Sequence, residues 1–184
     1  MRWILLAAAV VLAVTLPVRA QTARVVAVAD FDTISADSGR IPPAQLTALL
    51  AHLLAQQGAH LRVVAADAVR AALRARGYAP SDLVSPAVAA EVARAVGADW
   101  VVTGRWTQLR VVSFSVPDDP ATPAVRDGDG LAVADVQVRV LEAASRQRVF
   151  EGRFQGVVGG ADYGSLLLAA SEALRGAAAA IARL

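Results

Sequence analysis

The sequence predicts a single α/β domain, with a mixed sheet of about five strands flanked by four helices. Three observations indicate this fold. The first half alternates short apolar runs with segments of helical periodicity, which is typical of parallel strands joined by crossover helices. The second half changes to a period of two over three successive segments, which favours an antiparallel meander. The last segment returns to helical periodicity. We therefore expect two crossover-linked parallel strands that lead into a three-stranded meander.

The first strand is predicted over residues 24–31, a valine-rich apolar run that would be buried on both faces. Gly39 and the pair Pro42–Pro43 end the following loop and open a helix that stops at Gly58. A second short strand follows over 61–64. The apolar stripe of this first helix comprises Leu46, Leu49, Leu50, Leu53 and Leu54.

Two more helices are predicted before the meander. Asp67 is the expected cap of the first of these, and Gly77 closes it. Ser85 and Pro86 open the second, which ends at Gly97 in the position of a C-terminal cap. The residues expected to face the core are Val69, Ala72 and Leu73 in one helix and Val88, Val92 and Val96 in the other.

The meander begins at Trp100. Its first strand places Trp100, Val102, Trp106 and Val112 on one face, with a bulge or bend expected at residues 109–111 where the alternation weakens. The second strand covers 131–141, with Asp135, Gln137 and Arg139 facing outward. A turn at 143–146 leads to the third strand, over 149–157, with Phe150 and Phe154 on one face. The final helix has Ser165 as its expected N-cap and a buried stripe of Ala170, Leu174, Ala177, Ala178 and Ile181.

The first twenty residues have the pattern of a secretory signal peptide. Arg2 precedes an apolar run over 3–16, Pro17 closes it, and small residues precede a cleavage site after Ala20. We expect residues 1–20 to be removed, leaving a periplasmic domain over 21–184; the alternative is an uncleaved N-terminal anchor. We also expect no later helix to be suited to crossing a membrane.

Composition excludes several chemistries. The chain has no cysteine and no lysine, which excludes disulfides, thiolate zinc sites, an acylated N-terminal cysteine, lysine Schiff bases and a phosphate-loop lysine. Its two histidines, His52 and His60, have no spaced partner. Removal of Arg2 and Arg19 with the signal peptide leaves 16 arginines against 16 acidic residues. A neutral domain is poorly suited to nucleic-acid binding, which needs a concentrated basic surface.

Two groups of aspartates are the candidate contacts for a partner or an ion. Asp30 and Asp32 end the first strand, where ligands often bind in α/β sheets. The alternative is that Asp30 pairs with an arginine or a loop amide and Asp32 is solvated. The second group, in the long polar loop over 117–130, comprises Asp118, Asp119, Asp127 and Asp129.

Other local patterns are weaker. Residues 127–130 are similar to part of a calcium loop, but Leu131 and Val138 stand where further ligands belong. The glycines before the last helix match no phosphate-binding fingerprint, and Ser165 lacks the second glycine of a nucleophile elbow. We therefore assign no catalytic residue, cofactor site or metal site.

The stretch EVARAVGADWVVTG, over 91–104, resembles the curli-channel (CsgG-like) domain and the N-terminal domain of TolB and related envelope proteins. The resemblance extends to VAVADF in the first strand, to LLAHLLAQQGAHLRVV and to the alanine-rich last helix. It implies an α/β sandwich that is exported to the periplasm and works by protein–protein contact. By this resemblance, Gly97 is expected to cap a helix, Asp99 to be an acidic residue in a turn, and Gly104 to be a strand glycine at a site of close packing.

The chain departs from the curli channel in two ways. It lacks the cysteine that would carry a lipid anchor, and the 117–130 segment is too short for a membrane hairpin. The leading hypothesis is a non-enzymatic envelope adaptor or assembly domain that binds a protein or peptide partner through loops 32–43 and 117–130 or through the meander's outer edge. The alternatives are a channel-like homo-oligomer at the outer membrane and a carboxylate-based hydrolase centred on Asp30 and Asp32.

Overall fold

The structure is a computed structural model that describes residues 23–33, 41–113 and 130–184. The predictions for the signal peptide over 1–20, for Gly39 and for the four loop aspartates Asp118, Asp119, Asp127 and Asp129 lie outside these residues.

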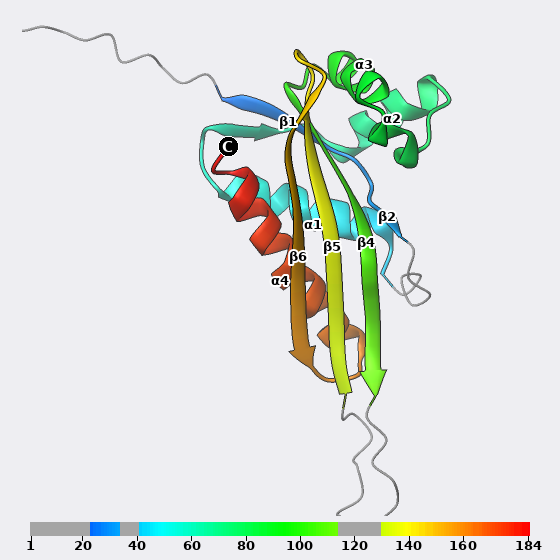
Figure 1. Cartoon of the computed structure of the whole chain (residues 1–184), viewed down its shortest axis with the longest axis vertical. Coiled ribbons are helices and arrows are strands. Elements are labelled where there is room, and N and C mark those ends of the chain that lie inside the picture. The colour runs from blue at the N-terminus through cyan, green and yellow to red at the C-terminus, as the bar shows by residue number, and fades with distance from the viewer. Residues whose placement is uncertain (1–22, 34–40, 114–129) are drawn as a thin grey trace, which may run out of the picture.

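A mixed sheet forms the centre of the domain, and its strands lie in the order β3-β1-β4-β5-β6 (Figure 1). The parallel pairs are β1 with β3 and β1 with β4, and β4, β5 and β6 form an antiparallel meander. The predicted fold class is therefore confirmed. The elements are β1 (Arg24–Val28), β2 (Asp32–Thr33), α1 (Pro43–Gln56), β3 (Leu61–Val63), α2 (Ala66–Ala75), the 3-10 helix η2 (Pro80–Val84), α3 (Pro86–Val96), β4 (Trp100–Ser113), β5 (Gly130–Glu142), β6 (Gln147–Gly159) and α4 (Tyr163–Ile181).

The helices cover the two faces of the sheet unequally. Helix α4 packs on one face along the meander and α1 lies on the same face against α4, β1 and β3, whereas α2, η2 and α3 cover only one end of the other face (Figure 1). This arrangement follows from the sequence, because β1 is apolar on both faces whereas β5 alternates apolar and polar residues beyond that end. Next to these helices, the second face of the meander is polar and carries Arg105, Gln137, Arg139, Glu151 and Arg153. Its far end carries the apolar side chains of Val112, Leu131, Val133 and Val157.

Two elements are present that the sequence did not predict. The first strand ends at Val28, and a two-residue strand, β2, pairs in parallel with β4. The 3-10 helix η2 precedes α3 and buries Leu83. Both elements are short, so they have no hydrophobic period that could identify them.

The glycine at 104 sets the position of β2. A Cβ atom at Gly104 would lie 2.4 Å from the ring of Phe31, so the absence of a side chain lets that ring pack directly on β4. Phe31 is buried and lies next to Trp106, with ring centroids 6.3 Å apart. This contact holds the chain after β1 against β4, where Asp32 pairs with Arg105. The expectation of a close-packing glycine is confirmed.

The bulge in β4 lies earlier than predicted. The register with β5 shifts between Trp106 and Gln108, not at residues 109–111. The extra residue reverses the alternation, so Leu109 is fully buried on the core face. The prediction that Val112 shares the face of Trp106 is therefore wrong, because the parity was extended through the bulge.

Two predicted helix caps are wrong. The side chain of Asp67 does not cap α2, whose N-cap is Ala65; it binds Arg70 one turn later. Helix α4 is capped by Asp162, whose carboxylate accepts the backbone N–H of Ser165 at 2.6 Å. The cap at Gly97 is confirmed, since this residue is left-handed, with φ of 65°.

Helix α4 lies unusually close to β6. A Cβ atom at Gly156 would stand 1.9 Å from the carbonyl oxygen of Ala169, and the helix face towards the sheet is mostly alanine.

Among the described helices, α4 alone is long and apolar enough to cross a membrane by length and composition, which departs from our expectation. Its predicted stripe is nevertheless buried against the sheet.

Candidate functional site

Asp30 is a structural clamp at the end of β1. Its carboxylate accepts hydrogen bonds from Arg70 of α2, at 2.8 and 3.0 Å, and from the hydroxyl of Thr47 of α1, at 2.8 Å. The hydrogen bond from Arg70 lowers the pKa of Asp30; partial burial opposes this shift and the Thr47 hydrogen bond adds to it. Asp30 thus joins two helices to the sheet. This agrees with the alternative that Asp30 pairs with an arginine.

Asp32 has a different partner and faces a different space. Its Oδ2 accepts a hydrogen bond from Nη2 of Arg105 at 2.9 Å, and it lines a pocket to which Asp30 does not contribute. The structure therefore does not bring the two predicted carboxylates into one site. Within the described ranges, no three acidic or histidine side chains gather closely enough to hold a metal ion.

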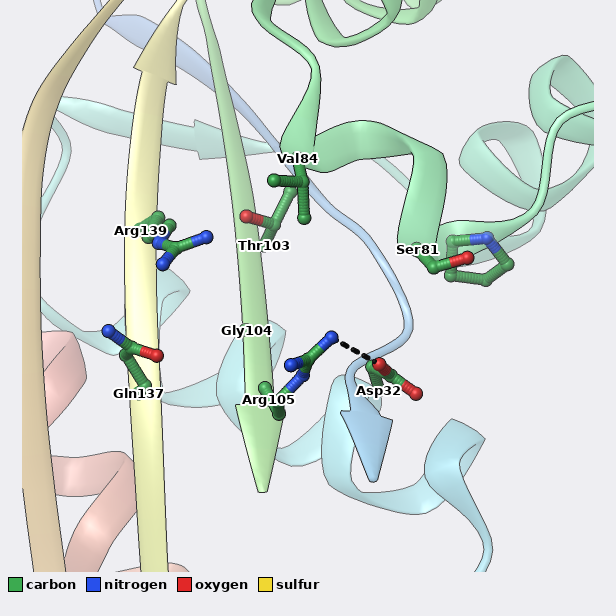
Figure 2. Close-up of a pocket in the computed structure, with 9 residues that line it drawn as sticks. Asp32, Ser81, Val84, Thr103, Gly104, Arg105, Gln137 and Arg139 are labelled. Carbon is green, nitrogen blue, oxygen red and sulfur yellow. Dashed lines mark hydrogen bonds and ion pairs between the residues drawn. The ribbon is translucent and has the colours of Figure 1, made fainter. Parts of the chain in front are cut away.

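The pocket beside Asp32 lies on the polar face of the sheet and has a volume of about 140 Å³ (Figure 2). Thr103 and Arg105 of β4 and Gln137 and Arg139 of β5 form its floor. They are directly opposed in register, Thr103 with Arg139 and Arg105 with Gln137. Pro80, Ser81 and Val84 of η2 and the side chain of Asp32 form its walls.

The floor of the pocket continues into an ion-paired network on β6. Oε1 of Glu151 accepts hydrogen bonds from Nε of Arg139 at 2.9 Å and from the amide of Gln137 at 2.7 Å, and Arg148 pairs with its other oxygen. The Arg139 hydrogen bond is the main cause that lowers the pKa of Glu151. This carboxylate is therefore charged at neutral pH and pairs with Arg139.

A second pair lies further along the same face. The guanidinium of Arg153 binds the carboxylate of Asp135, and this hydrogen bonding raises the pKa of Arg153. Asp135 is only 3% exposed although it lies on the face that we predicted to be wet. The arginine covers it, which explains how an acidic residue is buried there.

The outer edge of the meander is a long strand that is paired on one side. Among the described residues, β6 pairs only with β5 over its 13 residues. The side chain of Val157 in β6 is 46% exposed. Val149 is also exposed and lies beside a register shift in the pairing of β5 with β6. The charged Glu151 and Arg153 and this irregularity are features that limit indiscriminate pairing of an edge strand.

The sequence does not predict the pocket, but its floor lies on the predicted polar face. Gln137 and Arg139 were predicted to point outward, and their alternation with buried valines was the available signal. The pocket itself depends on η2 and β2, neither of which the sequence indicated.

No protein-family model matches this sequence, and no curated protein matches it either. The fold is similar to that of lipoprotein GNA1162 from Neisseria meningitidis, with a TM-score of 0.58 and 17% identity over 88% of this chain and 99% of that one. It is also similar to E. coli LpoB, with a TM-score of 0.52 and 19% identity over 75% of this chain and 58% of LpoB. The PelC dodecamer from Paraburkholderia phytofirmans has a TM-score of 0.50 and 17% identity, over 84% of this chain and 85% of that one.

These similarities establish a shared fold. The chain spans 58% of the length of LpoB, so it matches little more than half of that protein. None of the three is named as a curli-channel or TolB protein, and the resemblance to those families stays a prediction.

Proposed function

We propose that this chain is a non-enzymatic domain of the bacterial cell envelope that acts by contact with another protein. The observation that carries the proposal is the 13-residue edge strand β6, which pairs only with β5 among the described residues. An extended segment of a partner can pair with such an edge through main-chain hydrogen bonds. Export through a signal peptide over residues 1–20 and a CsgG-like or TolB-like ancestry are part of this proposal.

Two further observations support contact rather than catalysis. Carboxylates after β1 and on the polar face are bound by arginines: Asp30 by Arg70, Asp32 by Arg105 and Glu151 by Arg139. Such pairing keeps a carboxylate charged and oriented, which suits recognition better than proton transfer near neutral pH. The shared fold with a Neisseria lipoprotein agrees with a place in the envelope.

The test is photocross-linking in intact cells of the native host. A photoreactive residue replaces Val157 on the outer face of β6 in the full chain, and a matched variant carries it at Leu168, an exposed apolar residue of α4. We expect the first variant to form a covalent adduct of one discrete size, and the second to form little of it. Equal yields from both positions, or no adduct from Val157, would contradict the proposal.

A second candidate is a subunit of a homo-oligomer, because the similar PelC structure is a dodecamer. This candidate predicts that the exported protein sediments as a large ring at micromolar concentration. The leading proposal predicts a monomer whose cross-linked partner differs from the chain itself. Analytical ultracentrifugation and mass spectrometry of the Val157 adduct distinguish the two.

A further inference from the structure

We propose that the pocket between η2, β4 and β5 binds a carboxylate group of a partner polypeptide. This inference rests on the proposed function, because it names the chemistry of the partner. The two arginines of the floor, Arg105 and Arg139, stand at diagonal positions of neighbouring strands, since Arg105 is opposed to Gln137. Diagonal neighbours lie about 7–8 Å apart, a separation that two guanidinium groups can bridge through one shared anion.

Both arginines retain hydrogen-bond donors for a ligand. Arg105 uses Nη2 to bind Asp32, and Arg139 uses Nε to bind Glu151. Their other guanidinium nitrogens have no hydrogen-bond partner within the described part of the chain. Figure 2 shows the Arg139 guanidinium turned towards Thr103, whose hydroxyl points back across the floor of the pocket.

The groups already bound indicate which anion the pocket would take. The contacts at its rim are all to carboxylates: Arg105 holds that of Asp32, and both Arg139 and Gln137 hold that of Glu151. A planar guanidinium matches a carboxylate through parallel N–H bonds. The volume of about 140 Å³ suits a small group of this kind.

The local charge and the wall support the same ligand. Among the charged residues that line the pocket, Arg105 and Arg139 outnumber Asp32 by one positive charge. Val84, which is 54% exposed, and Pro80 provide an apolar lip beside the polar floor. An acidic side chain flanked by aliphatic residues on an extended partner would meet both surfaces.

The test uses acetate as the probe and acetamide as its neutral control, added to the exported, purified protein and followed by NMR of backbone amides. We expect acetate, but not acetamide, to shift the amides of Thr103–Arg105 and Gln137–Arg139 in a saturable manner. The double variant R105Q/R139Q should bind acetate at least about tenfold more weakly. The matched variant R62Q/R183Q removes the same charge from exposed positions outside the pocket and should bind as the wild type does.

A third variant distinguishes specific binding of acetate in the pocket from non-specific attraction of anions by positive charge. E151Q removes the intramolecular carboxylate that competes for Arg139, so acetate should bind about threefold more tightly or better. E172Q removes an acidic residue from the exposed surface of α4 and should have no effect. Equal acetate affinity in wild type and R105Q/R139Q would overturn the proposal, as would binding of inorganic phosphate at these amides without binding of acetate.

The failure of this inference is distinguishable from failure of the proposed function. If the pocket binds no carboxylate but Val157 still forms its discrete adduct, only the partner chemistry is wrong. If Val157 forms no adduct in cells, the protein-contact function itself is wrong.

Discussion

The contact between β6 and α4 yields the sharpest stability prediction, through the variant Gly156→Ala. The added Cβ would lie 1.9 Å from the carbonyl oxygen of Ala169 and 2.8 Å from its carbonyl carbon. Both are backbone atoms in the middle of a buried helix, so they cannot rotate away. The helix would have to retreat from the sheet by roughly 1 Å to restore a tolerable contact, against a close-packed interior.

The expected cost is at the upper end of the range for overpacking, about 3 kcal/mol of the free energy of unfolding. For a domain of this size that corresponds to a fall in Tm of roughly 6–12 °C. Gly159→Ala is the matched control, because it lies in the same strand with an ordinary φ and its Cβ would meet nothing within 4 Å. That variant should stay within about 0.5 kcal/mol of the wild type.

Thermal and urea unfolding of the two variants, followed by circular dichroism, gives the comparison. An unfolding free energy for Gly156→Ala equal to that of Gly159→Ala would refute the close packing of α4 on β6. It would also remove the reason for the alanine-rich face of that helix.

Three further predictions concern positions elsewhere in the fold. Gly104→Ala should lower the free energy of unfolding by about 1–3 kcal/mol, because the new methyl group meets the ring of Phe31. Combining it with Phe31→Leu should recover part of this loss, and additive effects of the two substitutions in urea unfolding would contradict this. Asp30→Asn should lower the free energy of unfolding, and the difference from the wild type should be largest above pH about 4 and become smaller as the pH falls. The reason is that the pKa of Asp30 is lower in the folded than in the unfolded chain; a difference that grows in acid would contradict this. Asp162→Ala should lower the free energy of unfolding by about 1 kcal/mol at neutral pH, because the N-terminal cap of α4 is lost. Hydrogen exchange of the Ser165 backbone amide should become faster, and an unchanged exchange rate of this amide would show that the cap lies elsewhere.

The regular part of the fold was predictable because its signals are long. The leucine stripe of α1 and the alternation in β5 each extend over several periods, and burial follows them closely. Helix ends were less predictable. A serine and an aspartate are both good caps, and the choice of Asp162 over Ser165 depends on where the turn after β6 directs the chain.

The candidate site was less predictable because tertiary contacts build it. The position of Asp32 depends on the packing of Phe31 against Gly104, and that of the pocket wall depends on η2. Asp30 and Asp32 are two residues apart in sequence, yet different arginines bind them. Sequence spacing therefore suggested a shared carboxylate site that the fold separates.

Amide hydrogen exchange of β6 in complex with the protein captured at Val157 tests most directly whether the meander's outer edge is the working surface. We predict that binding protects the β6 amides that point away from β5, with exchange in α2 and α3 unchanged. Protection confined to the outer surface of α4 or to β3, with β6 exchanging as in the free protein, would contradict this account.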